Sequence, residues 1–318
     1  MKHQQRGAAL LMAMLTVALV ATLASTALWQ QWRQVEIETA ERGRSQTAWM
    51  LTGAFDWTRL ILREDALSAQ GKGVDHLGEP WALPVQESRL SSFLSQDQQW
   101  QVGDSEVFLS GQITDAQSRM NVMNLLEDGQ ISVPALRRFG RLFTRLNLPE
   151  QELQTLVRQL QAAVKAQNTT APMPDGVPLM PQQTRQLVWL GLSPASLAAL
   201  ENFITVLPAA TPVNLNTAPA EVLMACLPGL DMAAAAQLVK RREQGHWATL
   251  EEVRKALGPL GQAVQEPHHS VQSQYFEVLG RMRIDQVVQQ ERSLVQRNGP
   301  QVSLVWRVRS AVPVTDAP

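Results

Sequence analysis

The stretch AALLMAMLTVALVATLASTALW, residues 8–29, contains no charged side chain and no histidine. As an α-helix rising about 1.5 Å per residue it would be about 33 Å long, which matches the hydrocarbon core of a bilayer. Lys2 and Arg6 precede it, and Trp29 and Arg33 mark its far end. Basic residues before an apolar helix and indoles after it predict a cytoplasmic N-terminus, with the rest of the chain across the membrane.

A cleaved secretory signal peptide is the competing interpretation of this stretch. The apolar run is longer than the roughly 7–15 residues of a signal-peptide core, and LASTA (residues 23–27) is the nearest approach to a cleavage site. The polarity changes instead between Gly7 and Ala8, ahead of the apolar run. A cut there would remove a short basic leader and leave the hydrophobic helix on the protein.

Helical periodicity continues beyond the apolar stretch. Apolar residues recur at helical spacing in Ala48, Leu51, Phe55 and Leu62, which predicts one long helix to about Leu67, half in lipid and half packed on a globular body. Glycines and prolines between Gly71 and Pro84 end the pattern.

Strand patterns lie on either side of a helical segment. Apolar residues alternate with polar ones in EVFLSGQI (106–113) and in YFEVLGRMRI (275–284), as in half-buried strands. Asn298-Gly299 between two further alternating runs predicts a hairpin turn, since both residues tolerate positive φ. In the last strand we expect a buried face made of Val302, Leu304, Trp306 and Val308.

The segment between these strands, residues 116–270, has helical character. Pro149 and Pro194 suit first-turn positions of helices, and Ser193 and Asp231 suit N-caps. The polar, proline-rich stretch 168–181 is predicted to be a loop. Strands that flank a helical block indicate one sheet with a domain inserted into one of its connections, because two separate domains would leave marginal strand pairs at both ends.

Residues 213–253 resemble the helix-hairpin-helix module of DNA-uptake receptors. Gly229 is present, but Asp231 replaces the second glycine of the hairpin. An acid at this helix N-terminus repels a phosphate and caps the helix itself. The basic residues 240–242 lie close to Glu243, Glu251 and Glu252, and the whole chain has a net charge of −1, so a structural helical fold is favoured over DNA binding.

Catalytic and metal-binding patterns are sparse. No Gly-rich phosphate loop, His-Glu-x-x-His or Gly-x-Ser-x-Gly sequence is present, and the single cysteine, Cys226, excludes an internal disulfide and a cysteine-based zinc site. These patterns predict no enzyme. Asp104, Glu106 and Asp115 are candidate calcium ligands, although a solvated acidic rim is favoured because no calcium-loop spacing is visible.

The N-terminal stretch resembles type IV pilin-like proteins, and the chain as a whole is similar to the type II secretion minor pseudopilin K family. Met12 stands at the fifth mature position, where pilin-like proteins usually carry Glu and this family typically lacks it. ITDAQSRMNVMNLL (113–126) is similar to the family's stretch leading into its inserted helical domain, and VNLNTAPAEVL (213–223) is similar to the second half of that domain. Ser118 and Met123 depart from the family pattern.

The resemblance implies an α+β fold, in which a long N-terminal helix packs on a small antiparallel sheet and a large all-α domain is inserted. It divides the chain into a leader (1–7), the helix (8–70, with the membrane span at 8–29), a body (71–115 and 271–318) and the insertion (116–270, with its helix-hairpin-helix-like second half at 213–260). Prepilin peptidase would cut between Gly7 and Ala8, and the new amine of Ala8 would be methylated. Calcium ligands in loops are also compatible with this family.

The function implied is that of a minor pseudopilin at the tip of a periplasmic pseudopilus, which starts its assembly and supports export of folded proteins across the outer membrane. Its partners would be the I-, J- and H-type minor pseudopilins and the major pseudopilin, and its location the bacterial inner membrane, with a single span and a large periplasmic domain. No nucleic-acid partner is expected. Two alternatives stay open: a helix-hairpin-helix DNA-uptake or DNA-binding membrane protein, and an ordinary single-span membrane protein with a helical binding domain.

Overall fold

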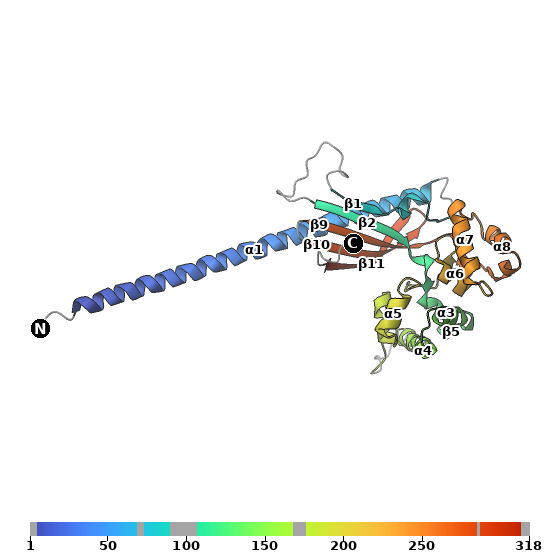
Figure 1. Ribbon diagram of the computed structural model, residues 1–318, viewed down its shortest axis with the longest axis horizontal. Helices are drawn as coiled ribbons and strands as arrows, with labels where there is room; N and C mark the ends of the chain where they lie inside the picture. The colour runs from blue at the N-terminus through green and yellow to red at the C-terminus, as the bar shows by residue number, and fades with distance from the viewer. Residues whose placement is uncertain (1–4, 69–72, 90–106, 168–175, 285–286, 313–318) are drawn as a thin grey trace.

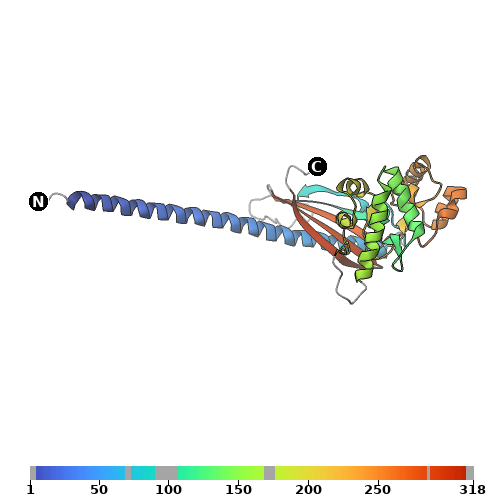
Figure 2. The same cartoon turned by 90° about the horizontal axis from the view of Figure 1, so that it is seen from below.

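The structure is a computed structural model that describes residues 5–68, 73–89, 107–167, 176–284 and 287–312. Its first element is a single helix, α1 (Gln5–Leu67), which extends far out of the globular body (Figures 1 and 2). Residues 8–42 of α1 are exposed throughout, whereas the helix is packed on the body from Thr47 onward. The predicted continuous helix ending at about Leu67 is confirmed.

The body contains one antiparallel sheet with the strand order β1-β2-β9-β10-β11. Its strands are β1 (Val85–Arg89), β2 (Val107–Asp115), β9 (Tyr275–Ile284), β10 (Val287–Asn298) and β11 (Gln301–Val312). β2 and β9 pair directly, with Asp115 opposite Phe276, although most of the chain between them lies in another domain. This pairing confirms one sheet with a large insertion in the connection from β2 to β9.

Helix α1 covers one face of this sheet. Phe55 and Leu62 of α1 are buried against Phe276 of β9 and Val295 of β10. Trp81, in the short 3₁₀ helix η1 (Pro80–Ala82), closes the end of this core and meets the Phe276 ring edge-on at 5.1 Å. The contact buries large apolar side chains from helix and sheet, which is the main source of stability for such a layer.

The inserted domain is mainly helical and has its own core. Its helices are α3 (Val133–Arg145), α4 (Glu150–Gln167), α5 (Pro194–Leu200), α6 (Ala220–Cys226), α7 (Met232–Gln244) and α8 (Leu250–Leu257), with 3₁₀ turns η2 (Ala116–Ser118), η3 (Val122–Leu125), η4 (Thr184–Leu190) and η5 (Gly258–Ala263). The domain also contains three short strand pairs. These are β3 (Met120–Asn121) with β6 (Ile204–Thr205), β4 (Leu126–Glu127) with β5 (Gln130–Ile131), and β7 (Val213–Asn214) with β8 (His269–Ser270). Helices α6, α7 and α8 of the domain lie at the end of the body opposite the chain's N-terminus, whereas α4 and α5 lie to one side of the sheet (Figure 1).

Two N-caps predicted from the sequence are present. The Ser193 hydroxyl accepts from the N–H of Ser196 at 3.2 Å, and Asp231 Oδ1 accepts from the N–H of Ala234 at 2.7 Å. Pro194 occupies the first turn of α5 as expected. Pro149 instead lies one residue before α4 begins.

Three details of the sheet differ from the prediction. β1 has no counterpart in the predicted strands. The hairpin turn is Gly299-Pro300 rather than Asn298-Gly299, because Asn298 still pairs with Gln301 and only Gly299 has a positive φ, of 56°. A glycine at the first turn position followed by a residue with negative φ is the pattern of a type II′ turn, which suits the twist of a hairpin.

The predicted buried face of β11 is wrong beyond Val302. Leu294 pairs with Trp306 while Val295 pairs with Leu304, so Val305 is an extra residue that makes a bulge. A bulge shifts the alternation by one residue. Leu304, which precedes the bulge, is 45% exposed on this edge strand; after the bulge the Arg307 guanidinium, rather than Trp306, lies over the Phe55 ring of α1, at 4.5 Å.

Candidate assembly surfaces and the domain junction

Residues 8–29 of α1 are suited to an apolar environment. Their hydroxyl groups are satisfied within the helix, since each donates to a main-chain carbonyl three or four residues earlier; these are Thr16, Thr22, Ser25 and Thr26. Pairing of this kind removes the cost of placing a hydroxyl in hydrocarbon. α1 is also the one helix among the described residues that is long and apolar enough to cross a membrane.

The border of the apolar stretch is marked by an aromatic pair and a cation. Trp29 and Trp32 are each nearly 60% exposed, and the Arg33 guanidinium lies 5.2 Å from the centre of the Trp29 ring. Indole rings and arginine side chains are suited to the headgroup region. This border therefore separates a lipid-compatible segment from the part of α1 that continues to the body.

The predicted processing and assembly residues lie near the start of α1. Gly7 is within the helix, Ala8 is exposed, and Met12, in the apolar stretch 8–29, is 68% exposed. Met12 thus offers an apolar side chain, with no charge, to whatever surrounds the anchor. A carboxylate at the same place would need a cationic partner to enter lipid at low cost.

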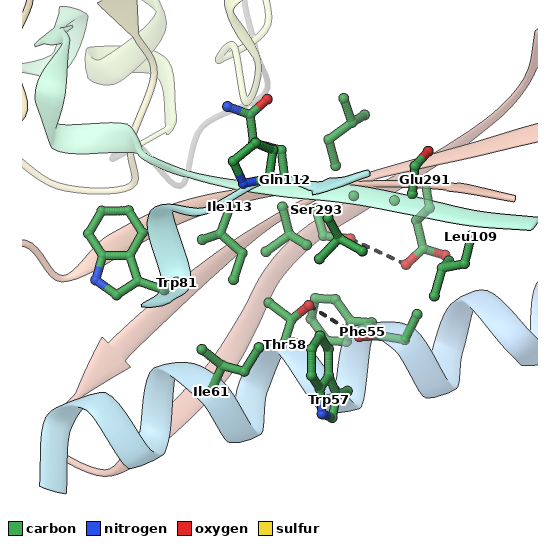
Figure 3. Close-up of a pocket in the computed structure, with 18 of the residues that line it drawn as sticks. Phe55, Trp57, Thr58, Ile61, Trp81, Leu109, Gln112, Ile113, Glu291 and Ser293 are labelled. Carbon is green, nitrogen blue, oxygen red and sulfur yellow. Dashed lines mark hydrogen bonds between the residues drawn. The ribbon is translucent and has the colours of Figure 1, made fainter. Parts of the chain in front are cut away.

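Beside the packed contact of helix and sheet, an apolar cavity of about 230 Å³ lies between α1 and the sheet (Figure 3). Phe55 and Ile61 line it from the helix, Leu109 and Ile113 from β2, and Trp81 from η1. Across the sheet, Gly111 of β2 is opposite Gly280 of β9, so two adjacent positions carry no side chain there. The helix–sheet interface is consequently less completely filled at this point than a typical protein core.

Asp115, a candidate calcium ligand, is instead the centre of a buried polar network at the junction of body and insertion. Its carboxylate accepts hydrogen bonds from the N–H of Gln117 at 2.7 Å, from Asn214 Nδ2 at 3.0 Å, and from the hydroxyls of Thr217 at 2.5 Å and Ser273 at 2.6 Å. Burial raises the pKa of Asp115, and the four hydrogen bonds oppose this shift.

Three of these donors share Oδ2 and the fourth uses Oδ1, so the carboxylate is held by neutral donors from both domains. Asp104 and Glu106, the other two calcium candidates, lie outside the described residues. The geometry of Asp115 therefore fits a role in joining the two domains.

A second cluster of acids surrounds Arg297 beside this network. Oxygen atoms of Asp65, Asp75 and Glu79 lie within 4.8 Å of one another. The Arg297 guanidinium pairs with Asp65 at 2.6 Å and also with Asp75, and its Cζ lies 4.7 Å from the centre of the Phe276 ring. This guanidinium supplies the positive charge that a metal ion would otherwise bring.

The same cluster ties three parts of the chain together. Asp65 belongs to the last turns of α1, Asp75 precedes η1, and Arg297 ends β10. Burial raises the pKa of Asp75 to about 6, against the opposing effect of Arg297. Sequence reasoning missed this cluster because Asp75 and Arg297 are 222 residues apart and no local pattern marks either of them.

The segment that resembles a DNA-binding hairpin uses its charged groups internally. Arg242, in the basic run of α7, is buried and donates to the Leu215 carbonyl at 2.7 Å; burial lowers its pKa to about 10. The Asp231 carboxylate accepts a hydrogen bond from an N-terminal N–H of α7, a group that a bound phosphate would need. Asn216 bonds both the N–H and the carbonyl of Trp247, each at 3.0 Å, which fixes the segment before α6 to the connection between α7 and α8. These contacts are those of a folding unit and do not favour the DNA-binding alternative.

Comparisons with known proteins agree with this architecture. Two models of the type II secretion system protein K family match residues 118–209 and 213–272. The chain is 27% identical to the type II secretion system protein K of Klebsiella pneumoniae, over 96% of this chain and 97% of that protein. It is 25% identical to the protein of the same name from Pseudomonas aeruginosa, over 93% of this chain and 90% of that one.

The fold also matches a solved structure. A chain of the GspK-GspI-GspJ complex from the enterotoxigenic Escherichia coli type 2 secretion system aligns with a TM-score of 0.63 and 18% sequence identity, over 85% of this chain and 98% of that chain. At this identity the match establishes a shared fold.

Proposed function

We propose that the chain is a minor pseudopilin of the type II secretion system protein K kind, which acts by assembly at the tip of the pseudopilus; its similarity to that family supports this proposal. The observation that carries this proposal is α1, which is a bare apolar rod over residues 8–29 and a core element of the body from Thr47 onward. Such a helix can rest in the inner membrane before assembly and then join a bundle of similar helices. In that bundle its exposed apolar side chains would be covered by neighbours.

The inserted domain supports a place at the tip. Its helices α6, α7 and α8 occupy the end of the body farthest from the N-terminus (Figures 1 and 2). Another subunit stacked above would have to pack on this domain in place of a pilin-like body. Met12 adds to the argument, since a subunit without an acid at this position has no charge to pair with the amine of a neighbour.

The partners follow from the same assignment. A protein of the same fold is solved in a complex with GspI and GspJ, and we extend this to the I-, J- and H-type minor pseudopilins and the major pseudopilin for the present chain. Together they would start the fibre and support export of folded proteins across the outer membrane. Protein K is a component of a secretion system, and we assign no catalytic role to the chain.

The proposal is tested by identifying the first residue of the native protein. Cleavage by prepilin peptidase between Gly7 and Ala8, followed by methylation, predicts a mature chain that starts at N-methylated Ala8 and fractionates with the inner membrane. Intact-mass spectrometry of the protein purified from membranes measures this. We expect Gly7→Leu to retain Met1, and Met12→Leu, five residues after the cut, to be processed normally. A native chain that keeps Met1, or that has lost residues 8–29, would contradict the proposal.

A further inference from the structure

The junction of the two domains contains a second cavity, on the opposite side of the sheet from α1. It has a volume of about 280 Å³ and lies between η4 and the hairpin of β10 and β11. Its floor is formed by Leu294 of β10 and by Trp306, Val308 and Ser310 of β11. These β11 side chains lie on this side because the bulge at Val305 shifts the alternation of the strand.

The wall and rim of this cleft are basic. Arg119 and Arg292 both pair with Glu277, at 2.5 and 3.4 Å, so that this one acid is shared by two arginines. Arg185, from η4, is exposed at the rim and forms no ion pair within the described residues. Glu201 is the other acid in the lining. Three arginines against two glutamates leave the cleft with a net positive charge.

The basic character continues along the sheet. On the same face Arg281 of β9 contacts the side-chain oxygen of Gln290 at 3.1 Å, and that contact involves no acid. Two donors at the cleft, Arg119 Nε and Trp306 Nε1, are buried without a partner among the described residues. An incoming acceptor that reached them through a side-chain rotation would gain a hydrogen bond without breaking one.

The cleft is also bordered by an edge of the sheet. β11 is the last strand in the strand order of the described sheet, and no strand pairs with its outer side. The main-chain groups of such an edge can pair with an extended segment of another chain. A segment added beside β11 would direct alternate side chains toward the arginines of the cleft.

From this geometry we propose that the cleft between η4 and the β10–β11 hairpin binds an acidic, extended segment of another minor pseudopilin. This inference rests on the proposed function for the identity of the partner. The chemistry of the partner segment comes from the charge of the cleft and from the free strand edge. Carboxylates of the segment pair with Arg185 and Arg292, while its apolar side chains cover Trp306 and Val308.

The test measures the binding of partner subunits to the full chain in mild detergent. The probes are the I-, J- and H-type minor pseudopilins of the same secretion system, offered singly and together, and the readout is the apparent Kd from biolayer interferometry. We expect the double variant Arg185→Glu/Val308→Glu to raise the Kd at least tenfold, because it places two negative charges at the binding site. The control is Arg137→Glu, which makes the charge change of Arg185→Glu at an exposed site on α3.

The outcomes separate this inference from the proposed function. Failure of the unchanged chain to bind any minor pseudopilin would refute the proposed function. Binding of the double variant as tightly as the unchanged chain would overturn the cleft inference alone. So would an equal loss of binding in Arg137→Glu, since the effect would then be one of overall charge. Melting curves by circular dichroism verify that the variants are folded, and Arg185→Glu alone serves as the test if the double variant is not.

Discussion

Two buried acids near the domain junction, Asp115 and Asp75, are stabilised by different kinds of partner. Around Asp115 the compensation comes from neutral donors, three of them side chains. Around Asp75 it comes from one guanidinium, that of Arg297. Buried carboxylates that are left without such partners cost several kcal/mol. The Asp115 group therefore makes the correct docking of body and insertion a condition for low energy, because its members come from both domains. The Asp75 group does the same for the docking of α1 on the body.

Glu79 gives this junction a testable dependence on pH. Burial raises its pKa from 4.5 to about 7, with further increases from Asp65 and Asp75, against hydrogen bonds from the His76 N–H and Trp81 Nε1. The folded chain therefore holds this proton more tightly than the unfolded chain. The stabilisation is complete below pH 4.5 and is lost as the pH rises through 7.

The measurement compares the native chain with Glu79→Gln. Between pH 5.5 and 8.5 we expect the free energy of unfolding to fall by about 2 kcal/mol more in the native chain than in the variant. Urea unfolding at the two pH values, in the same detergent, gives both numbers. Asp75 and Asp115 titrate in both proteins, so the difference isolates Glu79. Parallel pH profiles would show that Glu79 stays ionised in the fold.

At the scale of elements, the sequence predicted α1 and the interrupted sheet because each rests on a long, regular hydrophobic pattern. It did not predict β1, whose five residues VQESR carry one apolar side chain and become a strand only through pairing with β2. The bulge at Val305 is a similar case, since it exists only as a mismatch in length between β10 and β11. The long helix near residues 8–29 could thus be located from local chemistry, whereas the junction network and the cleft depend on contacts between distant segments.

The glycine pair in the sheet under α1 makes a prediction at this same scale. A methyl group on Gly280 would meet Leu51 Cδ2 at 3.5 Å, an ordinary contact inside the cavity, whereas one on Gly111 would lie 3.1 Å from the Leu279 carbonyl oxygen. We expect Gly280→Ala to stabilise the chain by about 0.5–1 kcal/mol, through reduced freedom of the unfolded strand and added packing. Gly111→Ala, the matched control, should stabilise less or destabilise. Urea midpoints of the two variants test this, and the reverse order would contradict it.

The whole molecule combines two folding units whose connections are short. The core of the insertion is formed by residues between Met120 and Val271, and its two ends meet where the N–H of Gln274 donates to Gln117 Oε1 at 2.6 Å. Nearby chain ends and a separate core are what make an insertion tolerable inside a sheet connection. The body in turn keeps β2 and β9 in register, so neither unit interrupts the packing of the other.

Residues 116–274 are therefore expected to fold when expressed alone. Far-ultraviolet circular dichroism should show helix, and urea should unfold the fragment in one cooperative transition. In this fragment Leu142→Ala, at a fully buried site in α3, should cost about 2–5 kcal/mol. Val133→Ala, on the exposed side of the same helix, should cost little. A fragment without a cooperative transition would mean that the insertion needs the body in order to fold.

The unbroken course of α1 has a mechanical consequence. In the proposed fibre, a force along the fibre axis would enter the body through a helix that packs on β9, β10 and β11, so the load would act on many side-chain contacts at once, in shear. An attachment through a terminal strand would instead concentrate the load on one row of hydrogen bonds at a time, as in unzipping. In such a fibre the buried side chains of Leu51, Phe55 and Leu62 would transmit an axial push from the helix to the whole body.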